Sequence, residues 1–286
     1  MSKSKIIQAA TVRASECNKK YFAEIDEIDE PYWAQAGGMA DGDGYLPKKH
    51  HKHQMVYELK MKDREPVQWL ADVYGTTISR ITYDENWEDC YKTVLHGKRA
   101  LHFMLKVCPY LVEKRKEATR IINIKFPNYH PPKIPMTLDN MSKHMGYIAG
   151  FFDAEGSVQC RYKRTKDNHD IIKQWVTITN TDIRPLKKIQ QILTSKPFSW
   201  TKKDVTIYSH QEKKIRLKDG GEKKLKHVMR FSTKAQITFM AIFQPIIQIK
   251  RKANIADKLK TLRSIDIFMG KRPRLNVKGR PVNVTR

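Results

Sequence analysis

Two short segments of this chain carry the same spacing of glycines and acidic residues. AGGMADGDG spans residues 36–44, and IAGFFDAEG spans residues 148–156. In each segment a glycine is followed by an Asp, then by a second acidic residue, and then directly by another glycine. Glycine allows two helix backbones to approach more closely than larger residues do. We therefore expect two helices that cross at their small residues, which are Gly37, Gly38, Ala149 and Gly150.

The duplication extends beyond these two segments. PYLVEKRK begins at residue 109 and PIIQIKRK begins at residue 245, so a Lys-Arg-Lys triplet follows a proline at the same offset in both places. An apolar, helix-like stretch precedes each proline, at residues 100–107 and 237–243. The chain is therefore predicted to consist of two repeated halves.

Between the acidic segment and the triplet, each half shows strand-like segments around one amphipathic helix. In the first half the strands are predicted at residues 44–49, 54–62, 77–83 and 90–95, and the helix at 67–73. In the second half the strands are predicted at residues 157–164, 171–179, 199–208 and 227–231, and the helix at 183–193. The alternation of polar and apolar residues indicates sheets with one solvated face. The predicted fold class is α+β, with two α-β-β-α-β-β-α halves whose helices cover one face of each sheet.

The same reading divides the chain into five segments. We expect an N-terminal extension at 1–30, the first repeat at 31–126, a proline-rich linker at 127–140, the second repeat at 141–264 and a basic tail at 265–286. The second repeat is longer because of a Lys- and Gly-rich segment at 209–226, which is typical of a long loop or an extended hairpin.

The charge of the chain restricts its partners. The 286 residues include 55 Lys and Arg but only 30 Asp and Glu, for a formal net charge of +25. Such a charge favours phosphate polymers or an anionic membrane surface. No apolar run approaches the roughly 18 residues that span a bilayer, and no apolar signal core begins the chain. We therefore expect a nucleic-acid partner and no membrane.

The cysteine pattern bears on the compartment. The four cysteines include no C-x-x-C pair, so neither a disulfide framework nor a zinc ribbon is indicated. Reduced thiols are expected, in an intracellular reducing compartment. An organelle and the cytoplasm of a bacterial or phage host fit equally well.

On the repeated segments the chain resembles the LAGLIDADG homing endonucleases in their single-chain, two-motif form, over residues 31–262. The second motif is a close match, whereas the first has Ala36 and Ala40 where large aliphatic residues are usual. The resemblance implies a monomeric, metal-dependent enzyme that hydrolyses both strands of double-stranded DNA at a long nonpalindromic site. Such cleavage supports mobility of the enzyme's own gene or intron.

The outer acids of the two segments, Asp43 and Glu155, are the expected catalytic residues. Crossed helices would bring both to the base of a saddle made by the two sheets. A helix C-terminus is a poor place for an anion, and a divalent cation offsets the repulsion between two carboxylates. Oxygen ligands together with DNA phosphates suit Mg²⁺. The metal set that the resemblance implies comprises these two acids with the neighbouring Gly42 and Ala154.

The inner acids and the triplets have different expected roles. Asp41 and Asp153 are expected to stabilise the helix interface. The resemblance implies that Lys114 and Lys250, the first residues of the triplets, polarise the scissile phosphate or its attacking water. The alternative is that both lysines belong to a solvated helix face.

Polar residues of the strands complete the expected site. The resemblance assigns Asp63 and Asn180 to a position at the end of the second strand that holds water, although Asp63 departs from the usual Gln or Asn. Alternate strand residues would face the major groove of bound DNA. The expected DNA-binding residues are Lys49, His51, His53, Gln54, Lys60, Gln159, Arg161, Lys163, Thr165 and Thr177. The alternative is that this face contacts only phosphates, which position a duplex without specifying its sequence.

Two other functions remain open at this point. One is an intron maturase that binds its host intron RNA on the same fold, with or without DNA cleavage. The other is a DNA-binding regulator without catalysis, which would bind without magnesium and leave the duplex intact.

Overall fold

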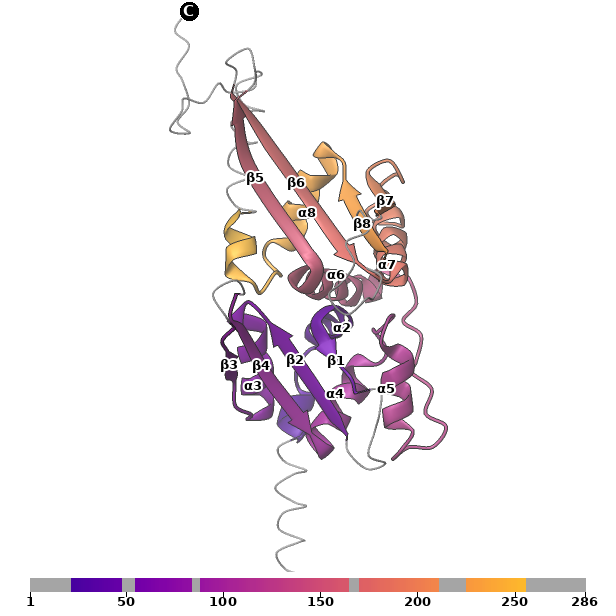
Figure 1. Cartoon of the computed structure of the whole chain (residues 1–286). Coiled ribbons are helices and arrows are strands. Elements are labelled where there is room, and N and C mark those ends of the chain that lie inside the picture. Colours follow the sequence, from indigo (N-terminus) through magenta and orange to yellow (C-terminus); the bar gives the residue numbers. More distant parts are fainter. Residues whose placement is uncertain (1–21, 48–54, 84–87, 165–169, 211–224, 256–286) are drawn as a thin grey trace, which may run out of the picture.

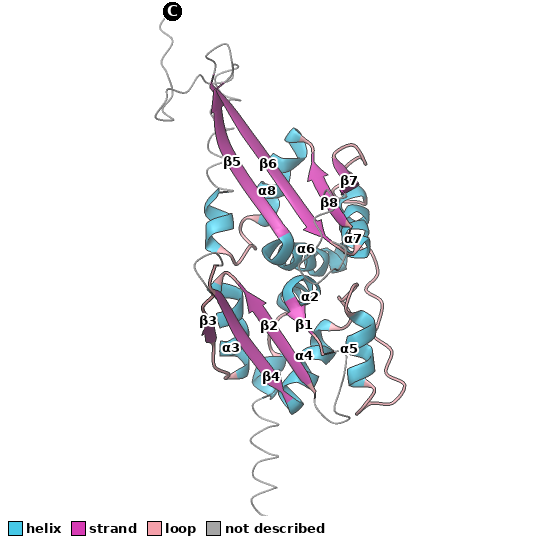
Figure 2. Ribbon diagram, in the orientation of Figure 1, coloured by secondary structure: helices cyan, strands magenta, loops and turns pink. Residues whose placement is uncertain are grey.

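The computed structural model describes residues 22–47, 55–83, 88–164, 170–210 and 225–255. Over these ranges the chain forms two halves, each with one four-stranded antiparallel sheet. Most helices of each half lie behind its sheet in the view of Figure 1, and α5 (Arg115–Ile122) lies beside the first sheet. The central helices α2 (Glu30–Asp43) and α6 (Met141–Glu155) lie between the halves. Both sheets therefore turn an uncovered face to the same side of the molecule (Figure 2). The predicted fold class is confirmed.

The first half runs from the first acidic segment to the helix that begins within the first Lys-Arg-Lys triplet. Its elements are α2 (Glu30–Asp43), β1 (Gly44–Tyr45), β2 (Val56–Met61), α3 (Arg64–Tyr74), β3 (Ser79–Ile81), β4 (Cys90–His96), α4 (Gly97–Val107) and α5 (Arg115–Ile122). The strands are ordered β1-β2-β4-β3. Helix α5 is an additional helix after the predicted α-β-β-α-β-β-α order of elements, and residues 48–54 are outside the described ranges.

The second half repeats this topology. Its elements are the 3₁₀ turn η1 (Leu138–Asn140), α6 (Met141–Glu155), β5 (Gly156–Arg164), β6 (Asp170–Asn180), α7 (Ile183–Thr194), β7 (Val205–His210), β8 (Lys226–Phe231) and α8 (Thr233–Phe243). The strands are ordered β5-β6-β8-β7, which is the order of the first sheet with four added to each number. Strands β7 and β8 pair antiparallel, and residues 211–224 between them are outside the described ranges.

Alternation along the strands separates a core face from an open face. In β2 the residues Tyr57, Leu59 and Met61 are buried, whereas the residues between them are partly exposed. Strand β6 alternates in the same way, with Val176 and Ile178 fully buried. The buried faces pack on amphipathic helices, as the period-2 pattern predicts.

Helices α2 and α6 pack together through glycines spaced four residues apart. A Cβ on Gly38 would lie 2.2 Å from the Tyr147 carbonyl oxygen, and a Cβ on Gly150 would lie 1.8 Å from the Gln35 carbonyl oxygen. Real Cβ atoms do not approach a backbone oxygen so closely, so only glycine permits this crossing. Gly37 has another role, because its added Cβ would meet the Tyr110 side chain at 2.9 Å. The prediction of crossed helices is confirmed, but Gly37 contacts the loop after α4 instead of the partner helix.

None of the helices in the described ranges combines the length and the apolar character that crossing a bilayer requires.

Candidate active site

The two outer acids end their helices where α2 and α6 touch. Asp43 is the last residue of α2 and Glu155 is the last residue of α6, and each is followed directly by a strand. A Cβ added to Gly42 would lie 2.3 Å from Ala154 Cβ and 3.1 Å from Glu155 Cγ, so the two helix ends are in contact. Burial, and next the charge of Asp43, raise the pKa of Glu155 to about 7. Burial also raises the pKa of Asp43. The structure therefore brings together two carboxylates that are costly to ionise, as the sequence predicts.

The inner acids hold the loops that carry the basic residues. Asp41 is fully buried, and its Oδ2 accepts hydrogen bonds from the Val112 N–H at 2.6 Å and from the Tyr147 hydroxyl at 2.9 Å. Its Oδ1 accepts a third from the Lys114 N–H at 3.0 Å. Tyr147 belongs to α6, so Asp41 joins both central helices to the loop after α4.

Asp153 repeats this arrangement in the second half. Its Oδ2 accepts from the Gln248 N–H at 3.0 Å and from Gln35 Nε2 at 3.3 Å, and its Oδ1 accepts from the Ile249 N–H at 3.2 Å. Gln35 and Tyr147 each stand six residues before the inner acid of their own helix. These contacts fit the interface role expected for the inner acids.

One lysine from each half donates to the carbonyls at the end of a central helix. Lys114 Nζ donates to the carbonyl oxygens of Ala40 at 2.8 Å, Asp41 at 2.5 Å and Gly42 at 2.9 Å. Because these carbonyls carry the negative end of the helix dipole, an ammonium group stabilises them. The carbonyl of Gly42, which belongs to the expected metal set, is therefore already bonded to Lys114, and Ala154 contributes its side chain to the helix contact.

The equivalent lysine of the second half is Lys252, and the prediction of Lys250 is wrong in this respect. Lys252 Nζ donates to the carbonyl of Phe152 at 2.9 Å and also to that of Asp153. Lys252 is only 4% exposed and burial lowers its pKa to about 8, whereas Lys250 is exposed at the start of a helical turn. The backbone between the Asp153 contact and the lysine is two residues longer than its counterpart in the first half, which shifts the register of the triplet.

Strand register corrects the expected pairing of Asp63 with Asn180. Gly44 pairs with Leu59 and Gly156 pairs with Ile178, so the residue equivalent to Asn180 is Met61. A two-residue slip keeps a residue on the same face of a strand, so the alternation alone does not reveal it. Asn180 Nδ2 donates to Glu155 Oε1 at 3.2 Å, whereas the first half has a buried thioether in its place.

Asp63 instead forms an ion pair that joins the halves. Both of its oxygens accept hydrogen bonds from Arg251, from Nε at 2.6 Å and from Nη2 at 2.7 Å. Asp63, Arg251, Asp43, Met61 and Lys252 are among the residues that line one cavity of about 310 Å³. Asp63 therefore lies beside the Asp43 carboxylate, but its oxygens are engaged with a guanidinium.

A further acid beside Glu155 was missed in the sequence. Glu113 lies beside Asn180, burial raises the pKa of Glu113, and the charge of Glu113 contributes to the raised pKa of Glu155. Its Oε2 is buried and has no hydrogen-bond partner among the described residues. The only sequence signal was its position directly before Lys114. A buried carboxylate oxygen without a donor is a suitable ligand for a cation.

The acids of the site can be compared with the ligands that a hydrated cation requires. Within the described ranges no group of three or more His, Cys, Asp or Glu side chains is placed to hold a metal ion. Mg²⁺ usually keeps several waters and takes one or two protein carboxylates together with phosphate oxygens. The two helix-terminal acids Asp43 and Glu155 fit that requirement.

Part of the expected DNA-binding set lies on the open face of the sheets. Lys60 is partly exposed on β2 and pairs with Lys92 of β4, while Thr177 of β6 pairs with Arg230 of β8. Gln159 is partly exposed on β5. Cross-strand partners share a face, so Lys92 and Arg230 join this surface, although the sequence reading omitted them. Lys49, His51, His53, Gln54 and Thr165 lie outside the described residues, as do the side chains of Arg161 and Lys163.

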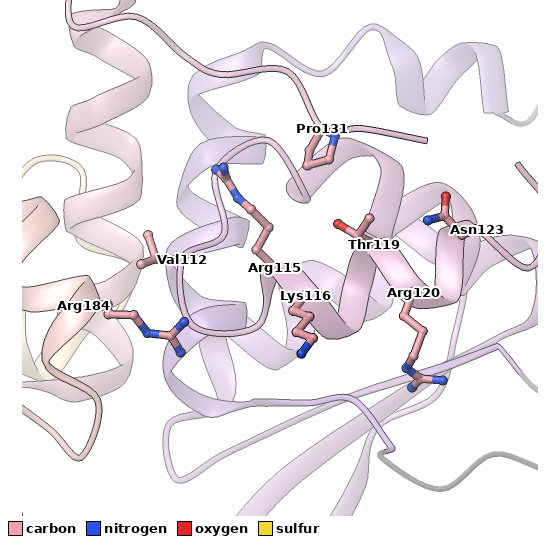
Figure 3. Close-up of a pocket in the computed structure, with 8 residues that line it drawn as sticks. All are labelled: Val112, Arg115, Lys116, Thr119, Arg120, Asn123, Pro131 and Arg184. Atoms are coloured by element: carbon pink, nitrogen blue, oxygen red, sulfur yellow. The ribbon is translucent and has the colours of Figure 1, made fainter. Parts of the chain in front are cut away.

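A basic cavity of about 570 Å³ flanks the site (Figure 3). Its lining comes mainly from α5 and includes Arg115, Lys116 and Arg120, with Arg184 from α7 on the opposite side. Arg184 is held by Asp182, whose N–H donates to Asn180 Oδ1 at 2.6 Å. The cavity is therefore linked to the Glu155 end of the site by a short series of hydrogen bonds.

Comparison with known proteins agrees with this geometry. A family model described as the LAGLIDADG-like domain matches residues 142–242. A mutant of I-SmaMI matches with a TM-score of 0.50 and 14% sequence identity, over 84% of this chain and 91% of that chain. The I-SmaMI LAGLIDADG homing endonuclease bound to cleaved DNA matches with a TM-score of 0.48 and 14% identity, over 87% of this chain and 92% of that chain. A search of curated protein sequences gives no match. Residues 142–242 thus match the LAGLIDADG-like domain model, and the chain as a whole is similar in fold to I-SmaMI.

Proposed function

We propose that this protein is a site-specific endonuclease that hydrolyses both strands of double-stranded DNA with the help of a divalent metal. The observation that carries the proposal is the contact between the C-terminal ends of α2 and α6, where Asp43 and Glu155 meet. Two carboxylates at the negative ends of two helix dipoles destabilise the fold unless cations offset their charge. A purely structural interface has no need of this arrangement in both halves.

Each side chain of the site has a proposed role. Asp43 and Glu155 would hold Mg²⁺, which, when bound, supplies charge to activate water and to stabilise the leaving oxygen. Lys114 and Lys252 lie beside the two acids and would polarise the scissile phosphates. Asn180 orients Glu155 through its amide N–H.

Binding of the duplex would use the open face of both sheets. The net charge of +25 supports extensive neutralisation of phosphates. The two faces carry different side chains, for example Lys60 beside Lys92 in one half and Thr177 beside Arg230 in the other. A single chain with two unlike faces would recognise a nonpalindromic site as a monomer. The biological role that we propose is mobility of the encoding gene or intron.

Cleavage of a randomised duplex library tests the proposal. The wild-type protein should cut discrete sites in Mg²⁺ and bind them without cutting in Ca²⁺. The double variant Asp43→Asn/Glu155→Gln should retain binding in Ca²⁺ and lose cleavage. Selected binding without any cleavage in Mg²⁺ would refute the nuclease and favour a regulator, whereas preferential binding of the host intron RNA would favour a maturase.

A further inference from the structure

The two lysines define which residues of the two halves are equivalent. Lys114 bonds the carbonyl three residues before Asp43, and Lys252 bonds the carbonyl three residues before Glu155. The residues directly before them, Glu113 and Arg251, are therefore equivalent in position and opposite in charge.

The same two-fold relation exposes a second difference. Asn180 donates to Glu155, and its counterpart in the first half is the buried Met61. The Asp43 end of the site therefore has no amide at this position, and it faces a cavity that also holds the guanidinium of Arg251. The Glu155 end has both the amide and an additional carboxylate, that of Glu113.

The charge difference between Glu113 and Arg251 acts in opposite directions on the cations of the two ends. At the Glu155 end, the Glu113 oxygen without a hydrogen-bond donor adds negative potential. At the Asp43 end, Asp63 is the additional acid, and Arg251 occupies both of its oxygens. A carboxylate that is bonded to a guanidinium through both oxygens offers little to a metal ion.

We propose that Glu113 and Arg251 make the two cleavage centres unequal, so that the centre of Glu155 takes up its divalent cation at lower concentration and cuts its DNA strand first. This inference rests on the proposed function. Glu113 serves as a positioning residue that raises the cation affinity of the Glu155 centre, and Arg251 lowers that of the Asp43 centre.

Strand-resolved cleavage tests the order. A target duplex would carry a different fluorophore on each strand, and Asp43→Asn and Glu155→Gln would assign each strand to its acid. In the wild type, the strand of Glu155 should be cut at several-fold lower Mg²⁺ concentration. Glu113→Gln should raise the Mg²⁺ requirement of that strand by about five- to tenfold and leave the other strand unchanged. Arg251→Gln should lower the requirement of the Asp43 strand. Glu117→Gln, which removes a charge from α5, should change neither strand.

A binding measurement that does not depend on cleavage completes the test. Free Mn²⁺ would be counted by electron paramagnetic resonance during titration of the protein alone. Two classes of site are expected, and Glu113→Gln and Glu155→Gln should weaken only the tighter class. A variant that simply misfolds would affect both classes alike.

These outcomes distinguish a failure of the proposed inequality from a failure of the proposed nuclease activity. Equal Mg²⁺ requirements for the two strands, or an equal effect of Glu113→Gln on both, would overturn the inequality while leaving the nuclease intact. Absence of any cleavage would overturn the proposed function, and a single class of Mn²⁺ sites unaffected by Glu113→Gln would then overturn the inequality as well.

Discussion

Replacing Glu155 with Gln should stabilise the metal-free protein. The pKa of this carboxyl is raised from 4.5 to about 7 by burial and by the neighbouring Asp43 charge. One pKa unit corresponds to about 1.4 kcal/mol, so the ionised carboxylate costs the fold about 3 kcal/mol. Gln removes that charge, keeps the shape of the side chain and retains the oxygen that accepts from Asn180.

The stabilisation should depend on pH with a defined sign. The folded state holds the Glu155 proton more tightly than the unfolded state, in which the group titrates near 4.5. Ionisation therefore removes stability as the pH rises from 4.5 through 7. Above pH 7 the variant should be more stable than the wild type by the full amount. Below pH 4.5 the two should be equally stable.

Thermal unfolding in EDTA at pH 8 and pH 5 measures this difference. A gain of about 3 kcal/mol corresponds to roughly 5–10 °C in Tm for a chain of this size. Glu117→Gln is the matched control, and its Tm should follow the wild type. Equal Tm values for Glu155→Gln and the wild type at pH 8, or an increase that is the same at both pH values, would refute the reasoning.

Three further predictions concern the buried lysine, the helix crossing and the positive net charge of the chain. Lys252→Met should slow single-turnover cleavage at least about tenfold because it removes a buried cation beside the acids, whereas Lys250→Met should stay within about twofold; the reverse order would restore Lys250 to the site. Gly150→Ala should destabilise the fold by about 3 kcal/mol or more, since its Cβ would meet the Gln35 carbonyl at 1.8 Å; an unchanged Tm would contradict the helix crossing. The logarithm of DNA affinity should fall linearly with the logarithm of salt concentration with a slope of about −4 or steeper; a flat salt response in equilibrium binding would exclude the open face as a phosphate-binding surface.

The periodic features of the fold could be predicted because they are local. Alternation of polar and apolar residues identified the strands, and the repeated glycines identified the helices that cross. A strand has one buried face wherever it packs, and a helix crossing as close as that at Gly150 requires glycine in any protein. The acids Asp43 and Glu155 follow from the same segments, since they end the helices that the glycines bring together.

The corrections all concern contacts between distant parts of the chain. Arg251 and Asp63 are 188 residues apart, and nothing local to either residue indicates their ion pair. Lys252 replaces Lys250 because the backbone from the Asp153 contact to the lysine is two residues longer than in the first half, and a Lys-Arg-Lys triplet offers a cation at either position. The strand register likewise shows that the first-half equivalent of Asn180 is Met61 and not Asp63.

The sequence by itself determined that two glycine-rich helices cross and that an acid ends each of them, because backbone approach and helix ends depend on neighbouring residues. Only the tertiary structure decided which charges surround those acids. Glu113 beside Glu155 and Arg251 beside Asp43 belong to the opposite half from the acid that each accompanies. Their positions depend on how the halves dock and on loop length, and neither quantity is encoded in the repeat.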